Sequence, residues 1–290
     1  MLRTAFLIMR IIEFEITVSD DGRQIRDFLR EFGVASSLLT KLKNTENGIT
    51  INGEFARTID RLYAGDRLKI AIESKGKMPS KLICSEVRAE YNDEDILILN
   101  KPAFMPVHES RNHQGDTLAN AAACYMDENN AFRAVYRLDR DTSGLVLIAK
   151  NELAAGKLAG NIKKDYYAVV SGELSGSGTI DLPIRRVRES IIERGVFDDG
   201  ERAVTHWEAV DSKEGRTLIK INLETGRTHQ IRVHFSHLGY PLLGDTLYGG
   251  DTSLINRQAL HCKTVYFKHP VTSKSIVIDS DFPTDFKGLI

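Results

Sequence analysis

Short apolar runs typical of β-strands recur along the chain after about residue 82, and this pattern limits the fold more than any other feature. The runs lie at residues 96–99, 145–148, 167–170, 218–221 and 275–278. Helical patterns lie between them at residues 118–126, 153–162 and 229–237. Strands mixed irregularly with helices favour an α+β fold built around one large sheet.

A separate unit precedes this region. Residues 23–32 place apolar side chains on one face at helical spacing, and Gly33 follows as a stop signal. Ser36 or Ser37 can cap a second helix. The order of these signals predicts two short helices near the N-terminus.

Strand and turn signals complete this unit and mark its end. Asn47-Gly48 predicts a turn before a strand at residues 49–51, and residues 68–72 alternate like another strand. A polar stretch with Gly and Pro but no periodicity comes next, which is typical of a linker. We therefore predict a small α+β domain at residues 9–74, a linker at 75–84 and a larger domain at 85–290.

Net charge and hydropathy exclude some functions. The chain has 290 residues and a formal net charge of -1, which argues against a simple polybasic nucleic-acid binder but allows a local basic groove. No segment approaches the roughly 18 apolar residues of a membrane helix, so we predict no membrane span. The apolar start is too short for a signal peptide, and we expect translation to begin at Met9 and not at Met1.

The number and spacing of the cysteines indicate the cell compartment in which the protein folds. Cys84, Cys124 and Cys262 are odd in number and widely spaced. This spacing predicts neither a disulfide framework nor a zinc site, and it fits the reducing cytoplasm.

A charged loop stands directly before one of the apolar runs. The segment Arg137-Leu-Asp-Arg-Asp-Thr-Ser-Gly144 is followed by the wholly apolar residues 145–149. A loop of this kind, held by a core strand, is a suitable place for a reactive carboxylate. A charged surface turn formed by Asp141 or Thr142 fits the same residues, so both interpretations stay open on this segment alone.

A second polar segment leads into the helix predicted at 229–237. Thr228 is a suitable N-cap, and Arg227 adds positive charge to the helix N-terminus, which favours a bound carboxylate or phosphate. His229 and His234 suggest a metal, but they are five residues apart and point to different faces, unlike the i, i+4 pair of a helical zinc site. We predict no metal ion.

Four segments in order resemble the RluA class of RNA pseudouridine synthases. They are residues 100–108, the loop 137–144, the triplet Lys164-Asp-Tyr166, and residues 225–234 together with 244–249. The resemblance covers about residues 90–272. It implies an α+β pseudouridine synthase fold with a large mixed, mainly antiparallel sheet and a catalytic cleft. The family usually has His where this chain has Tyr136.

The unit at residues 9–74 also resembles a known domain. Its helix–helix–turn–strand pattern is similar to the S-four-type RNA-binding domain, a common companion of this class. Any small α+β domain would fit the same residues nearly as well.

The resemblance implies a role for each site residue. Asp139 would be the catalytic carboxylate, Arg227 would pair with it and keep it ionised, and Tyr166 would stack against the uracil. Arg137 would fill the position that the flipped base leaves in the RNA. The residues expected to bind substrate are Arg137, Arg140, Thr142 and Ile231. Isomerisation needs no redox change or group donor, so we expect no cofactor.

The expected function is isomerisation of specific uridines in structured RNA by a monomeric enzyme. Large-subunit ribosomal RNA is the favoured partner and transfer RNA the alternative. A catalytically inactive ribosomal RNA-binding protein is a rival, although Asp139, Tyr166 and Arg227 are all intact. A hydrolase that uses Asp139 with His229 or His234 is another, but the chain lacks a nucleophile elbow and metal spacing.

Overall fold

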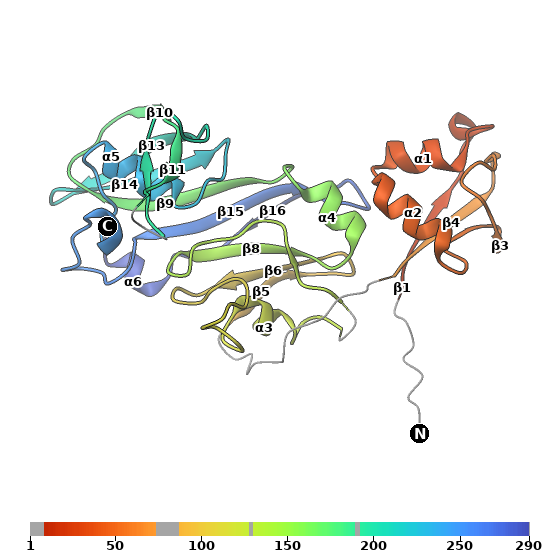
Figure 1. Cartoon of the computed structure of the whole chain (residues 1–290), viewed down its shortest axis with the longest axis horizontal. Coiled ribbons are helices and arrows are strands. Elements are labelled where there is room, and N and C mark those ends of the chain that lie inside the picture. Colours follow the sequence, from red (N-terminus) through yellow and green to blue (C-terminus); the bar gives the residue numbers. More distant parts are fainter. Residues whose placement is uncertain (1–8, 74–86, 128–129, 189–191, 290) are drawn as a thin grey trace, which may run out of the picture.

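Two sheets and a separate hairpin make up the strand framework of the protein (Figure 1). The structure is a computed structural model that describes residues 9–73, 87–127, 130–188 and 192–289. The residues before Met9 and the linker predicted at 75–84 lie outside the described residues. No helix among the described residues is long and apolar enough to cross a membrane.

The N-terminal unit is a four-stranded antiparallel sheet covered by helices, with strand order β1-β4-β2-β3. Its elements are β1 (Met9–Glu15), the 3₁₀ turn η1 (Val18–Asp20), α1 (Ile25–Phe32), α2 (Ser36–Asn44), β2 (Ile49–Ile51), β3 (Glu54–Phe55) and β4 (Arg67–Glu73). Gly33 ends α1 in the left-handed conformation, with φ 102°, as the sequence predicts. The predicted serine cap of α2 is wrong, because Ala35 is the N-cap and makes no side-chain bond.

A ten-stranded sheet forms the large unit, with the path β10-β13-β14-β9-β15-β8-β6-β5, and β16 and β7 pair with β15 and β8. Its strands are β5 (Arg88–Asn92), β6 (Ile96–Lys101), β7 (Arg133–Ala134), β8 (Ser143–Ala149), β9 (Lys163–Ser171), β10 (Ser177–Asp181), β13 (Val204–Lys213), β14 (Arg216–Leu223), β15 (Leu260–Lys268) and β16 (Ser275–Asp279). Among the strand pairs of the described residues, β8 and β15 alone run parallel, and the other pairs are antiparallel. The mixed, mainly antiparallel sheet predicted from the sequence is therefore confirmed.

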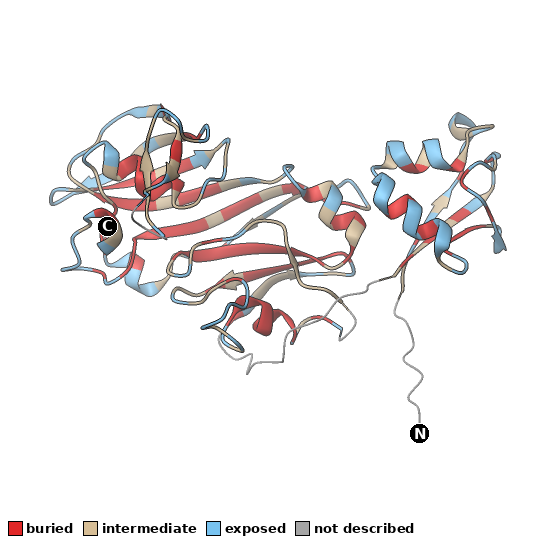
Figure 2. Ribbon diagram, in the orientation of Figure 1, coloured by how far each residue is buried: buried red, intermediate tan, exposed pale blue. Residues whose placement is uncertain are grey.

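The strand β8 lies between β15 and β6 in this sheet. All of its residues are buried, as expected for a strand covered on both faces, and Figure 2 shows the long neighbouring strands largely buried as well. Gly144 has φ 116°, and a Cβ there would lie 2.2 Å from the carbonyl oxygen of Cys262 on β15. Only glycine lets these two strands approach so closely.

Short helices and a hairpin surround the sheet. They are α3 (Leu118–Ala122), α4 (Glu152–Leu158), α5 (Gln230–His237), the 3₁₀ turn η2 (Thr246–Tyr248), α6 (Thr284–Lys287) and the hairpin of β11 (Ile184–Arg186) and β12 (Arg194–Val196). The predicted helices are present but α3 and α4 end earlier. Cys124 is disulfide-bonded, contrary to the sequence-based prediction, whereas Cys262 is free and buried.

The small unit packs against α4 at one end of the large sheet, and α5 lies toward the other end (Figure 1). Leu153 of α4 is 2% exposed and belongs to the apolar core of the small unit. The Lys157 ammonium lies 3.9 Å from the centre of the Phe32 ring. Arg10 donates two hydrogen bonds of 2.9 Å to the buried carboxylate of Asp95. Apolar and ionic contacts together fix the position of the small unit.

Candidate active site

A cavity of about 700 Å³ lies between the loop before β8, the start of β9 and the N-terminal end of α5. All seven site residues predicted from the sequence border it: Arg137, Asp139, Arg140, Thr142, Tyr166, Arg227 and Ile231. The sheet therefore joins segments that are nearly 100 residues apart in sequence, because β8, β15 and β9 are adjacent. The seven residues thus share one location, but one predicted pairing differs.

The loop that carries Asp139 is held from behind by Lys101. The Lys101 side chain is fully buried and its Nζ donates hydrogen bonds to three carbonyl oxygens, those of Pro102, Met105 and Arg140, at 2.8 to 2.9 Å. Burial lowers the pKa of Lys101 to about 7, while the charges of Asp141 and Asp139 oppose that change. Three carbonyl acceptors match the three hydrogens of an ammonium group. Lys101 thus ties the reactive loop to the end of β6.

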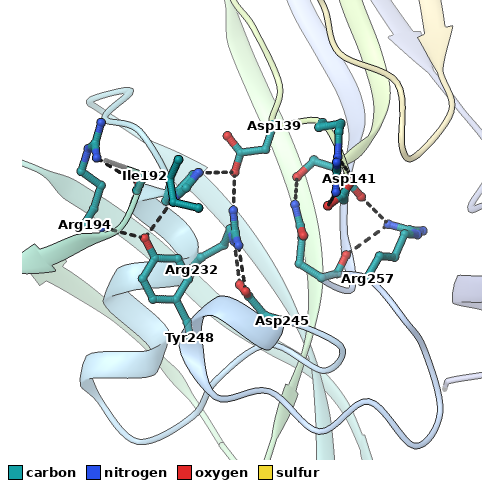
Figure 3. A network of polar contacts seen from close by, with 12 residues as sticks. Asp139, Asp141, Ile192, Arg194, Arg232, Asp245, Tyr248 and Arg257 are labelled. Carbon is teal, nitrogen blue, oxygen red and sulfur yellow. Dashed lines mark hydrogen bonds and ion pairs between the residues drawn. The ribbon is translucent and has the colours of Figure 1, made fainter. Parts of the chain in front are cut away.

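A second buried cation supports the far side of the same loop. Arg257 is fully buried and donates to the carbonyl oxygen of Asp141 at 3.2 Å, while its other nitrogens bond Asp285 (Figure 3). Gln258 donates to the Thr142 hydroxyl at 3.1 Å. The Thr142 hydroxyl therefore helps to fix the conformation of the loop.

Asp139 forms its ion pair with Arg232, not with Arg227 (Figure 3). Arg232 Nη1 lies 3.1 Å from Asp139 Oδ2, and the other side of the guanidinium forms a two-point pair with Asp245, at 2.6 and 2.8 Å. Burial alone would lower the pKa of Arg232, but the hydrogen bonds and charges of Asp245 and Asp139 raise it. Arg232 is consequently a permanent, fixed cation beside the carboxylate.

The predicted pairing of Arg227 with Asp139 is therefore wrong. Arg227 lies on the cavity rim, where its Nη1 is 2.5 Å from Glu201 and its Nε donates to the carbonyl oxygen of Arg202. The physical reason is the turn at His229, which has φ 57° and, in place of the predicted Thr228, is the N-cap of α5. This turn directs the first helical residues toward Asp139 and leaves Arg227 outside. The available signal was the position of Arg232 between the apolar residues Ile231 and Val233, since a buried cation needs a partner.

The inner wall of the cavity is aromatic. Tyr166 is 6% exposed, and burial raises its pKa well above the usual value, with Cys262 and Asp139 adding to the effect. Tyr136 donates to the carbonyl oxygen of Leu145 at 2.9 Å, and the Lys164 ammonium lies 4.2 Å from its ring centre. Tyr136, which stands where the family usually has histidine, thus bonds to β8 and contacts a cation with the face of its ring. Because its pKa is raised, Tyr166 stays a neutral phenol.

The described residues show a single group with possible metal-binding geometry, Asp93, Asp95 and His269, and it does not border the cavity. Its atoms already have protein partners: Arg10 and Asn151 bond Asp95, and Tyr91 bonds Asp93. These contacts account for the cluster as part of the joint between the two units. His234, considered above as a ligand, is bonded to Thr205 and to the carbonyl oxygen of Leu182.

Comparison with known proteins shows the family of the chain. A sequence profile described as RNA pseudouridylate synthase matches residues 95–237. The chain is 38% identical over 282 residues to YjbO, an uncharacterised RNA pseudouridine synthase of Bacillus subtilis, with 92% of this chain and 98% of that protein covered. It is 36% identical to ribosomal large subunit pseudouridine synthase D of Pseudomonas aeruginosa, with 83% and 82% covered.

The chain belongs to the RluA class of RNA pseudouridine synthases. It is an RNA isomerase, as the sequence motifs predicted. Among solved structures, human RNA pseudouridylate synthase domain containing 1 has the same fold, with a TM-score of 0.58, 23% identity, and 69% of this chain and 85% of that chain covered. In this pseudouridine synthase, residues beyond the sequence-based set also shape the site: Lys101, Arg232 and His229.

Proposed function

We propose that this enzyme converts specific uridines of large-subunit ribosomal RNA to pseudouridine and that Asp139 is its reacting carboxylate. Support for the RNA class comes from relatives named as ribosomal large subunit pseudouridine synthase D, among them that of Xanthomonas campestris at 35% identity over 263 residues. Support for Asp139 comes from its place at the cavity.

The observation that carries the proposal is the pairing of Asp139 with Arg232 at the edge of the cavity. The Asp139 side chain is 28% exposed, whereas Arg232 is 8% exposed. One partner is therefore fixed in the protein and the other is open to a ligand. An adjacent cation favours the ionised form of a carboxylate, which is the form that can attack or remove a proton.

The reaction balances without a co-reactant. The bond between ribose C1′ and uracil N1 breaks, the base turns, and a bond forms between C1′ and C5. The hydrogen on C5 leaves as a proton and N1 gains one. Asp139 can add to the ribose or assist elimination from it, and both routes need a charged carboxylate.

Arg137 and Tyr166 are proposed to hold the RNA and the turned base. Arg137 is exposed, and among the described residues its guanidinium has no hydrogen bond or ion pair. It is thus available to enter the RNA stack in place of the uridine, where a planar guanidinium can both stack and donate. Tyr166 keeps its proton, which suits a stacking surface better than a base.

We also propose that the small unit is an S-four-type RNA-binding domain. Arg30 of α1 and Lys43 of α2 are exposed, and their side chains have no described ion-pair partner. Charge reversal to Glu at both should weaken RNA binding and reduce its salt dependence, with kcat at saturating RNA retained. An unchanged affinity would remove this role from α1 and α2.

The decisive experiment compares two carboxylates of one loop. Pseudouridines would be mapped in ribosomal and transfer RNA from cells that lack the protein and from cells complemented with Asp139→Asn or Asp141→Asn. Asp141 is the matched control, since its carboxylate pairs with Arg140 at 2.7 Å and does not border the cavity. We expect ribosomal sites to be lost with Asp139→Asn and restored with Asp141→Asn. Sites restored by Asp139→Asn would refute the catalytic role, and sites lost from transfer RNA alone would move the substrate to that class.

A further inference from the structure

Two hydrogen bonds lead from the β11–β12 hairpin to His229, whose ring faces the carboxylate of Asp139. The backbone N–H of Arg194, the first residue of β12, donates to the Tyr248 hydroxyl at 3.0 Å. That hydroxyl lies 2.8 Å from Nδ1 of His229. The other ring nitrogen of His229, Nε2, lies 3.9 Å from Oδ2 of Asp139. Figure 3 shows Tyr248 beside both Arg194 and Arg232.

These hydrogen bonds fix the tautomer of His229. A phenol has one hydrogen, and the Tyr248 oxygen already accepts from Arg194. Its hydrogen then goes to Nδ1 of His229, which leaves the imidazole hydrogen on Nε2. The opposite tautomer would turn a lone pair of Nε2 toward a carboxylate and would leave the phenol hydrogen without a partner among the described residues.

The ionisation states agree with this assignment. Burial raises the pKa of Tyr248 to about 12, so the phenol keeps its hydrogen at neutral pH. Burial also lowers the pKa of His229, although Asp139 opposes that effect, and the ring is therefore neutral. The backbone also limits where the ring can lie, because His229 is held in the left-handed region at φ 57°.

One oxygen of Asp139 accepts the hydrogen bond of Arg232 and also faces the His229 ring. Arg232 Nη1 and His229 Nε2 both face Oδ2, at 3.1 and 3.9 Å. Within the described parts of the chain, Oδ1 accepts no hydrogen bond. An oxygen held by donors is less basic than a free one, so the carboxylate is made asymmetric.

We propose that Tyr248, itself held by Arg194, is a positioning residue that keeps the Nε2–H of His229 toward Oδ2 of Asp139, so that Oδ1 is the oxygen that reacts. This inference rests on the proposed function for Asp139 and extends it to the choice of oxygen. Tyr248 acts through His229 and touches neither the ribose nor the base.

The first test measures the tautomer in the resting protein without RNA. Histidine labelled with nitrogen-15 reports which ring nitrogen carries the hydrogen, and the His229 signals are assigned by their loss in His229→Gln. We expect hydrogen on Nε2 in the native protein and a mixture of tautomers in Tyr248→Phe. Hydrogen on Nδ1 in the native protein would overturn the inference, whatever the enzyme's activity.

The second test measures turnover. Tyr248→Phe removes the hydrogen bond that orients the neutral His229 ring, so kcat should fall by about threefold to tenfold with the KM for RNA unchanged. His229→Gln keeps an N–H near the Nε2 position and should retain more kcat than His229→Leu. Tyr240→Phe is the matched control, since Tyr240 does not border the cavity. Equal kcat in Tyr248→Phe and the native enzyme would refute the positioning role.

Failure of the proposed function and failure of the positioning inference give different results. If the native protein has the expected tautomer but forms no pseudouridine in any RNA, the proposed function fails, and with it the assignment of Oδ1. If the native protein forms pseudouridine but carries hydrogen on Nδ1, the positioning inference alone fails.

Discussion

Replacement of Arg232 by lysine separates positive charge from guanidinium geometry at the site. Arg232 donates two hydrogen bonds to Asp245 and one to Asp139. Lysine keeps the charge but lacks the planar fork, so one ammonium cannot serve both carboxylates. Loss of one such charged hydrogen bond costs roughly 1.5–3 kcal/mol. We expect Arg232→Lys to lower the free energy of unfolding by about 2 kcal/mol and kcat by about 30-fold.

The comparison variant is Arg227→Lys, in the segment just before the same helix. Arg227 is 39% exposed and its partner Glu201 is 70% exposed, so their ion pair is worth about 0–1 kcal/mol. Urea denaturation measures stability, and single-turnover pseudouridine formation at saturating RNA measures the chemical step. A larger loss of kcat in Arg227→Lys than in Arg232→Lys would contradict the assignment of Arg232 as the partner of Asp139.

Three further predictions concern the stability of the folded protein. Gly144→Ala places a Cβ 2.2 Å from the carbonyl oxygen of Cys262, so we expect a large fall in the melting temperature, and an unchanged value would contradict the close strand contact. Leu153→Ala empties a buried site shared by the two units, and urea denaturation should show a loss of about 2–5 kcal/mol, against no loss if the small unit is only tethered. Burial lowers the pKa of His261 to about 3. Between that value and the ordinary value of about 6.5, the unfolded chain binds more protons, so the free energy of unfolding should fall as the pH drops, by up to about 1.4 kcal/mol per pH unit. His261→Gln should flatten that dependence, and an equal slope in both proteins would place the effect elsewhere.

Local patterns were enough to predict much of the secondary structure. The apolar run at 145–148 lies within β8, and the alternating run at 68–72 lies within β4. Such signals depend on near neighbours only: burial on both faces of a strand, or the conformational freedom of Gly33 at a helix end. Strands with mixed composition, such as β10, β12 and β13, were not predicted, because they are strands through pairing with partners distant in sequence.

The sequence by itself indicated which segments of the chain border the cavity. The charged loop around Asp139, the tyrosine at 166 and the segment before α5 all border one cavity. The resemblance of these segments, in their order, to a known family carried that information, because the loop at 137–144 taken alone fits a charged surface turn equally well.

Only the tertiary structure decided which cation meets the carboxylate. Arg227 and Arg232 stand five positions apart on either side of the turn at His229, and both carry the same charge. Sequence spacing does not fix the direction of a side chain across a left-handed turn, whereas folding places Arg232 between Asp139 and Asp245. Ion pairs depend on distance in space, and a backbone rotation at one residue is enough to exchange one partner for another.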